Sequence, residues 1–308
     1  MAPFETYILP ARARTALWRF IVGFLVIVAF YVAGSILLFM AGSALLGVDL
    51  LGLNVPEPGS VAGALSNTPK GLIVMLASFA SIWIGLWVAG RFLHKQNFAT
   101  FFSPKAGPQL DLFLRGTAFG LLFALISLLI GLLISTPVRT DLEFSQWTFF
   151  LTPVVGMVFV QATAEELLFR GYLLQQFATR WNSWLIWAFL PSFFFGMLHF
   201  DPALPDHVGY YYVLATLLFG LTACILVWRS GSLWPAIGLH VSVNIVGLSS
   251  LSVPSHALGM ELWMASDSEA LQLMRVDIFL AFIALAVVLS PVGRFFEAKP
   301  EETSQLFK

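Results

Sequence analysis

Residues 154–174 read VVGMVFVQATAEELLFRGYLL, an apolar run that is interrupted by Glu165, Glu166 and Arg170. The run is long enough to cross a bilayer, which takes about 20 residues in a helix. A charged side chain at the centre of a membrane helix costs about 2.5–3.5 kcal/mol even on the most lenient scale. Two adjacent glutamates at that depth therefore indicate a functional site inside a membrane-spanning helix.

The composition of the whole chain is that of a membrane protein. Of its 308 residues, 58% are hydrophobic and 11% are charged, whereas soluble domains carry about 25% charged residues. The net charge is −1 and no basic block is present, which excludes nucleic acid as a partner. The one cysteine, Cys224, excludes an internal disulfide, and we expect it to be a small buried hydrophobe.

Apolar runs of spanning length recur along the chain, separated by polar or Pro/Gly-rich segments. They predict an all-α fold, a polytopic membrane helix bundle with about eight transmembrane helices. The predicted helices cover residues 18–46, 71–93, 112–135, 148–176, 184–200, 210–228, 233–252 and 276–296. No internal repeat is visible, so we expect one integral membrane domain.

The distribution of lysine and arginine predicts how the bundle is oriented, because these residues collect on the cytoplasmic side. Eight spans with both termini in the cytoplasm leave three basic residues outside: Lys70, Arg139 and Arg275. The remaining basic residues that bear on this prediction fall at or near the inner face: Arg12, Arg14, Arg19, Arg91, Lys95, Lys105, Arg115, Arg180, Arg229, Arg294, Lys299 and Lys308.

Two pairs of polar residues in the predicted spans have the spacing i,i+4, which brings side chains together on one helix face. Glu166 and Arg170 form the first pair, so we expect them to meet and leave Glu165, about 100° away, as the freer carboxylate. His240 and Asn244 form the second pair. His199 lies near the end of the fifth span, which would place it closer to the outer face than the others.

These residue types fit two kinds of hydrolytic site. In one, Glu165 and His199 activate a water, while His240 and Asn244 donate hydrogen bonds to an oxyanion. In the other, Glu165, His199 and His240 ligate a divalent metal such as zinc, which lowers the pKa of a bound water. Two non-hydrolytic alternatives are a proton-coupled transporter and a non-catalytic membrane scaffold or immunity factor of the same fold.

Three ordered motifs carry a resemblance to a known family. EExxxR (Glu165, Glu166, Arg170), FxxxH (Phe195, His199) and HxxxN (His240, Asn244) follow one another on successive apolar segments. The set resembles the CAAX protease and bacteriocin-processing (CPBP) family of intramembrane proteases, similar to the type II CAAX prenyl endopeptidase. The sequence has no HExxH or GxGD motif, so the other zinc and aspartyl types are not indicated.

The resemblance implies an intramembrane endopeptidase and a role for each matched residue. Glu165 would be the general base with His199 assisting, His240 and Asn244 the oxyanion pair, and Glu166 and Arg170 supporting residues. Residues 148–252 would form the catalytic core of helices 4–7. Residues 1–147 would supply helices 1–3, and residues 253–308 an outer loop, the last helix and a cytoplasmic tail.

Members of this family are commonly labelled metalloproteases, but we favour a glutamate mechanism with no required cofactor. The expected substrate is a membrane-anchored protein or peptide, and the expected location is a bacterial plasma membrane, with the lipid bilayer as the other partner. The sequence leaves the oligomeric state and the substrate's identity open.

Overall fold

The computed structural model describes residues 2–46, 68–105, 107–202, 204–205 and 207–297. Most of them lie in helices or short helical turns. The only strands among them are β1 (Val138–Arg139), β2 (Leu251–Ser252) and β3 (Trp263–Met264), which form a small sheet in the order β1-β3-β2. The main helices are α1 (Pro3–Ile8), α2 (Leu17–Leu46), α4 (Pro69–Ser78), α5 (Ala80–Val88), α6 (Leu110–Ile134), α7 (Phe144–Glu166), α8 (Leu174–Ala178), α9 (Leu190–Met197), α10 (Val208–Ser230), α11 (Trp234–Ser249) and α12 (Ala270–Leu289). The predicted all-α class is confirmed.

Six helical segments in the described part of the chain are long and apolar enough to cross a membrane: Leu17–Leu45, Pro69–His94, Leu110–Ile134, Phe144–Ala178, Val208–Ser230 and Asp267–Leu289. Two further apolar helical segments are shorter, Leu185–Met197 and Trp234–Ser249. Together they correspond to the eight predicted spans. The chain is a polytopic helical membrane protein.

The predicted bounds of the last span, 276–296, are wrong. Helix α12 begins at Ala270, after a capping box in which Ser266 and Glu269 satisfy each other's backbone groups, and it ends before Pro291. Arg275, which the prediction placed in the outer loop, therefore lies within the helix. The sequence signal for the earlier start is the pair Ser266 and Glu269, which has the spacing of a capping box.

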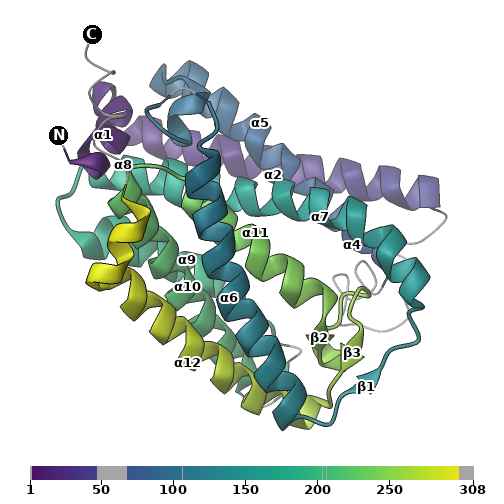
Figure 1. Ribbon diagram of the computed structural model, residues 1–308. Coiled ribbons are helices and arrows are strands. Elements are labelled where there is room, and N and C mark those ends of the chain that lie inside the picture. The colour runs from purple at the N-terminus through teal and green to yellow at the C-terminus, as the bar shows by residue number, and fades with distance from the viewer. Residues whose placement is uncertain (1, 47–67, 106, 203, 206, 298–308) are drawn as a thin grey trace.

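The helices run between two ends of the bundle (Figure 1). Helix α1 and the start of α2 lie at one end, and the three strands lie at the other. Helix α6 packs along α11, α10 packs against α9 and α12, and α7 packs against α4 and α11. This arrangement surrounds α11 with α6, α7 and α10, so the polar residues of the predicted seventh span face the interior of the bundle.

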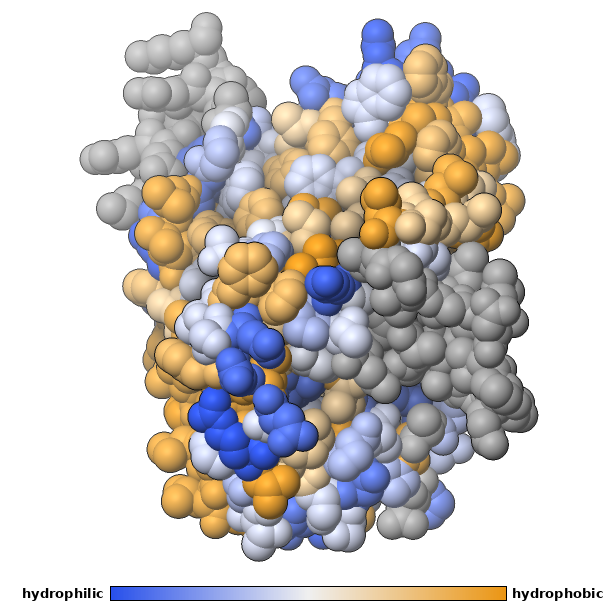
Figure 2. Space-filling view, turned by 90° about the vertical axis from the view of Figure 1, so that its right-hand side faces the viewer, coloured by the Kyte–Doolittle hydropathy of each residue, from blue (hydrophilic) through white to orange (hydrophobic). Residues whose placement is uncertain are grey.

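Basic side chains tie the helix ends together at the end that carries α1. Arg19 donates to the carbonyl of Leu93 at 2.6 Å, and Arg115 donates to the carbonyl of Phe295 at 2.6 Å. Lys299 and Lys308 lie outside the described residues. Figure 2 views the right-hand side of Figure 1, where hydrophilic side chains gather on the lower part of the face and hydrophobic ones lie along its left margin and at its upper right.

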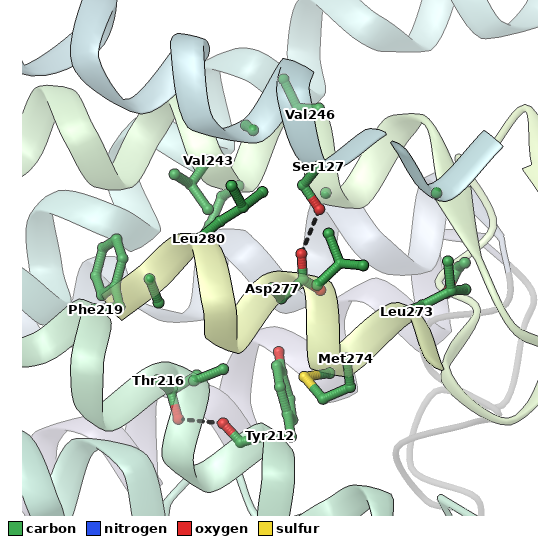
Figure 3. Close-up of a pocket in the computed structure, with 18 of the residues that line it drawn as sticks. Ser127, Tyr212, Thr216, Phe219, Val243, Val246, Leu273, Met274, Asp277 and Leu280 are labelled. Atoms are coloured by element: carbon green, nitrogen blue, oxygen red, sulfur yellow. Dashed lines mark hydrogen bonds between the residues drawn. The ribbon is translucent and has the colours of Figure 1, made fainter. Parts of the chain in front are cut away.

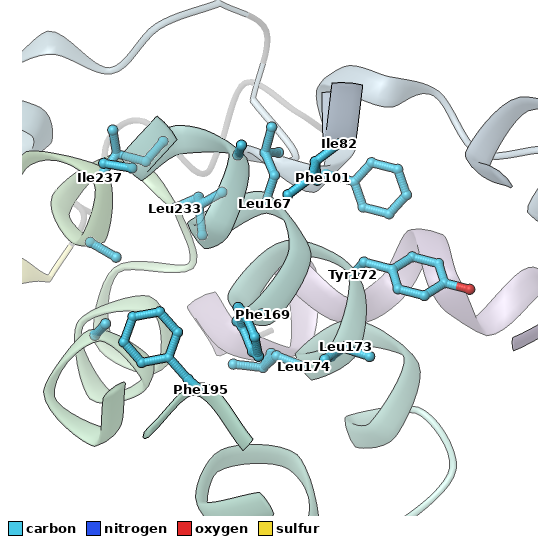
Figure 4. Close-up of a cluster of buried hydrophobic side chains, with 14 of the residues drawn as sticks. Ile82, Phe101, Leu167, Phe169, Tyr172, Leu173, Leu174, Phe195, Leu233 and Ile237 are labelled. Carbon is cyan, nitrogen blue, oxygen red and sulfur yellow. The ribbon is translucent and has the colours of Figure 1, made fainter. Parts of the chain in front are cut away.

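The core of the bundle is built around a π-helical turn, Leu167–Leu173, that continues α7. Its buried side chains pack with Phe101, Phe195 and Leu233 from other parts of the chain (Figure 4). A π turn frees backbone carbonyls that an α-helix would use. The hydroxyl of Tyr7, in α1, lies 3.0 Å from the Arg170 carbonyl oxygen, so the N-terminal helix holds this turn in place.

Candidate functional site

Glu166 occupies the centre of a fully buried polar network. Its Oε1 accepts a hydrogen bond from Nη1 of Arg170 at 2.9 Å and another from Nδ1 of His240 at 2.8 Å. The expected contact with Arg170 is present, and the contact with His240 is one that the i,i+4 spacing alone did not predict. Glu166 therefore joins the EExxxR motif of α7 to the HxxxN motif of α11.

Arg170 is enclosed by aromatic and small residues. Its guanidinium carbon lies 4.6 Å from the centre of the Phe195 ring, a distance at which a cation is attracted to the ring face. At Gly220 on α10, a Cβ atom would lie only 2.8 Å from Nη2 of Arg170. A guanidinium stays charged in proteins, so this arginine is the positive charge that compensates Glu166 at full burial.

His240 lies between the two glutamates. Its Nδ1 binds Glu166, while its Nε2 is 3.6 Å from Oε2 of Glu165. The latter distance is too long for a direct hydrogen bond, and it is short enough that one oxygen atom beside the two groups could contact both. The rings of Phe195 and Phe219 pack edge-on against the imidazole, with centroids 5.9 and 4.9 Å away, and fix its plane.

His199 lies beside Phe195, the aromatic residue that also contacts His240. The fifth span is only thirteen residues long, Leu185–Met197, so His199 follows the helix end and is not deep within it. Its Nδ1 is 2.8 Å from the Phe195 carbonyl oxygen, and the two rings are 4.6 Å apart. A carbonyl can only accept, so Nδ1 carries the proton and Nε2 is left as the acceptor of the neutral ring.

His199 and Glu165 were expected to face each other as a water-activating pair. Among the described residues the ion-pair partner of Glu165 is His240, and no contact joins Glu165 to His199. Both histidines instead pack against the Phe195 ring, His240 from α11 and His199 from just after the end of α9. The physical reason is that His240 lies within α11, which packs directly against α7, and so comes beside Glu165.

Asn244 is oriented by a residue that the sequence analysis missed. Its Nδ2 donates to Oε1 of Gln161 at 2.9 Å, and Gln161 is buried on α7 one turn before Glu165. Because one hydrogen of the Asn244 amide is used here, the other remains available to a second acceptor. Gln161 lies at i−4 from Glu165, and a search that included amides as well as ionisable groups would have found it.

A cavity of about 390 Å³ opens between α6, α10, α11 and α12. His199, His240 and Asn244 line it together with mainly apolar side chains, some of which are seen in Figure 3. The two glutamates are not among its lining residues, so Glu165 faces the cavity through His240. The cavity has the size of a small-ligand or peptide side-chain site.

Tyr212 on α10 is a second residue that the motifs did not indicate. It lines the cavity, and its ring lies 5.8 Å from His199 and 5.1 Å from His256. Tyr212 thus lies between His199 of the FxxxH motif and His256, which follows strand β2. It stands in an apolar run without a charged residue at helical spacing, so the sequence did not indicate it.

The three residues proposed as metal ligands do not form a metal site in this structure. Within the residues that the structure describes, no three His, Cys, Asp or Glu side chains are grouped closely enough to hold an ion. Zinc in hydrolases takes three protein ligands at about 2.0–2.3 Å. Here Glu165 approaches His240 but His199 does not join them, and Nδ1 of His240 is taken by Glu166. The donor set does not fit the metal alternative.

Comparison with known proteins supports the resemblance carried by the three motifs. Residues 145–246 match the family model of the type II CAAX prenyl endopeptidase Rce1-like proteins. The chain is also similar to the uncharacterized protein YyaK of Bacillus subtilis (strain 168), at 27% identity over 247 residues, which cover 78% of this chain and 80% of that protein. The expected resemblance to this protease family is confirmed for the segment that carries all six candidate residues.

Proposed function

We propose that this protein is an intramembrane endopeptidase that cleaves a membrane-anchored protein or peptide with a glutamate-activated water. The observation that carries the proposal is the placement of His240, whose two ring nitrogens face Glu165 and Glu166 at the edge of a mainly apolar cavity. The match to a family of proteases supports the reaction class.

Charge balance suggests the protonation state in which the site works. Glu165, Glu166 and Arg170 together carry one net negative charge, and an uncompensated charge in a membrane interior is costly. An imidazolium at His240 brings the sum of the four groups to zero. In that state Nδ1 donates to Glu166 and Nε2 also carries a hydrogen, so His240 can donate to an oxyanion.

The reaction then needs only residues of this chain. Glu165 accepts a proton from water as the oxygen attacks the scissile carbonyl carbon, and the negative charge moves to the carbonyl oxygen. His240 Nε2 and the second hydrogen of the Asn244 amide donate to that oxyanion. When the C–N bond breaks, the leaving nitrogen takes the proton from Glu165, giving a carboxylic acid and an amine and restoring the Glu165 carboxylate; the acid proton then passes to the amine. His199, with Nε2 as acceptor, assists in orienting the water.

The experiment compares new protein N-termini in membranes of cells that express the wild type or the Glu165→Gln variant. We expect cleavage products in the wild type only, and a loss of about 10²–10⁴ in rate for Glu165→Gln, the usual contribution of a general base. The exposed Glu143→Gln change, at the start of the same helix, is the matched control and should keep wild-type activity.

Assays of the purified protein in liposomes distinguish a protease from a transporter and from a non-catalytic scaffold or immunity factor. Equal cleavage by the wild type, Glu165→Gln and His240→Ala would refute the protease mechanism. A proton flux that is lost in Glu165→Gln, without cleavage of any membrane protein, would indicate a transporter, and neither activity would indicate a scaffold or immunity factor. A strong chelator should leave cleavage intact; inhibition that added zinc reverses would contradict the metal-free mechanism.

A further inference from the structure

Asp277 places a carboxylate in the wall of the cavity, away from the three motifs. It lies on α12, inside the segment Asp267–Leu289 that is long and apolar enough to span the membrane. Ser127 on α6 donates a hydrogen bond to one of its oxygens (Figure 3). No ion pair joins Asp277 to any residue in the described part of the chain, so no cationic side chain among those residues compensates its charge.

The surroundings of Asp277 resemble a binding pocket more than a structural contact. Leu273, Met274 and Leu280 line the cavity on the same helix, and Tyr212 lies close to Asp277 from the opposite wall (Figure 3). An intramembrane acid that faces a cavity is by default a functional residue. If its only task were to join α12 to α6, a neutral hydroxyl or amide would do so at a lower cost.

Asp277 and the apolar side chains around it indicate which kind of ligand this part of the cavity can bind. A carboxylate surrounded by apolar side chains complements a basic side chain, since lysine and arginine pack their apolar stems against such surfaces and present a charged head. The rest of the cavity lining adds a second carboxylate, that of Glu261, and the imidazole of His256, which lies 3.5 Å from Asp201. No lysine or arginine of the described residues lines the cavity.

We propose that Asp277 forms a subsite that binds a basic side chain of the membrane peptide that the enzyme cleaves. This inference rests on the proposed function and names a substrate feature that the catalytic residues do not determine. Along α12 the cavity extends from Ala270 to Ala284, and Asp277 lies seven residues from its inner limit. Leu239 and Phe219, which adjoin His240, pack with Val288 of α12, so this limit is the one nearer the catalytic residues. Seven residues at 1.5 Å are about 10 Å, or about three residues of an extended peptide.

Peptide binding to the Glu165→Gln protein, in which we expect cleavage to be largely abolished, tests this subsite. The probes are labelled Ala/Leu-rich peptides of 20 residues with one central Lys, Gln or Glu, and binding to the Glu165→Gln protein in detergent is followed by fluorescence anisotropy. We expect the Lys peptide to bind about tenfold more tightly than the Gln peptide, which is ~1.4 kcal/mol, and the Glu peptide to bind most weakly.

The decisive variant is Asp277→Asn in the same background, because the amide still accepts the hydrogen bond from Ser127. It should reduce the Lys/Gln difference to less than twofold, whereas Ser127→Ala, which keeps the carboxylate, should preserve the difference. Unchanged unfolding temperatures show that each variant is folded. Equal binding of Lys and Gln peptides by the Glu165→Gln protein, or a preference that survives in Asp277→Asn, would overturn the subsite.

Cleavage by the otherwise wild-type protein separates this inference from the proposed function. Cleavage sites without a basic residue about two to four positions away would contradict the subsite and leave the protease proposal standing. A Lys preference in binding, with no cleavage of any membrane protein, would contradict the protease proposal and leave the cation subsite standing.

Discussion

The polar side chains of this site restrain one another, so few of them act alone. Glu166 binds both Arg170 and His240, and Gln161 binds Asn244. The two residues that would contact an oxyanion are thus each held by a residue of α7. A group held in this way keeps its orientation before substrate arrives, which is the basis of electrostatic preorganisation.

Gln161 is therefore predicted to be a positioning residue. The Gln161→Met variant keeps the size of the side chain but removes the acceptor for Asn244, and we expect kcat to fall about tenfold with KM little changed. The effect should be smaller than that of Asn244→Ala, since the loss of an oxyanion donor costs about 10²–10³ in kcat.

A double-mutant cycle on kcat provides the control for Gln161. In the Asn244→Ala background, Gln161→Met should cause little further loss, because the amide that it orients is already gone. Additive losses would show that Gln161 acts on stability or on another group, and a fall in unfolding temperature would point to the former.

Close packing of α6 against α11 is what brings the HxxxN motif to the cavity. Gly116 and Gly120 of α6 face α11, and a Cβ at Gly120 would overlap Ser242 Oγ and lie 2.7 Å from the Leu239 carbonyl oxygen. Small residues at this spacing let membrane helices approach closely and compensate for the missing hydrophobic force between them. The contact sets the depth of His240, which follows Leu239 directly.

We predict that Gly120→Ala separates α6 from α11 and lowers both stability and activity. Overpacking of a well-packed interface costs about 1–3 kcal/mol, which thermal unfolding in detergent will report, and cleavage should fall because His240 and Asn244 move. Gly156→Ala on α7 is the matched control: a Cβ there meets nothing within 4 Å. Equal stability of the two variants would show that the α6–α11 contact is looser than the structure has it.

The molecule as a whole has one end with basic side chains bound to helix ends and another with three short strands. Arg12 lies at the first end and Arg139, in β1, at the second. The excess of lysine and arginine at the first end predicts that it faces the cytoplasm. Its orientation in the membrane decides from which side a substrate meets the cavity.

A single-cysteine experiment tests this orientation in intact cells. Cys224 is buried, so the wild type should not react with a membrane-impermeant maleimide and serves as the blank. We expect the Arg139→Cys variant to be labelled from outside, and the Arg12→Cys variant only after the cells are opened. The reverse pattern would contradict the prediction that the N-terminus is cytoplasmic.

The amino-acid sequence by itself determined the class of the molecule and the local part of the site. Continuous apolar runs of about 20 residues indicate membrane-spanning helices, because a helix satisfies all its backbone hydrogen bonds within one segment. The Glu166–Arg170 contact follows from helix periodicity, which depends on neighbours in the chain alone. The order of the three motifs was sufficient to indicate the protease family that the comparison then matched over residues 145–246.

Only the tertiary structure decided which residues meet across helices. His240, and not His199, is the described partner of Glu165, Gln161 orients Asn244, and Asp277 lines the same cavity as the residues of the motifs. Each of these contacts depends on the offset and crossing of two helices. Those quantities come from the packing of small residues and from helix ends, such as the early end of α9 at Met197, and no spacing along one helix encodes them.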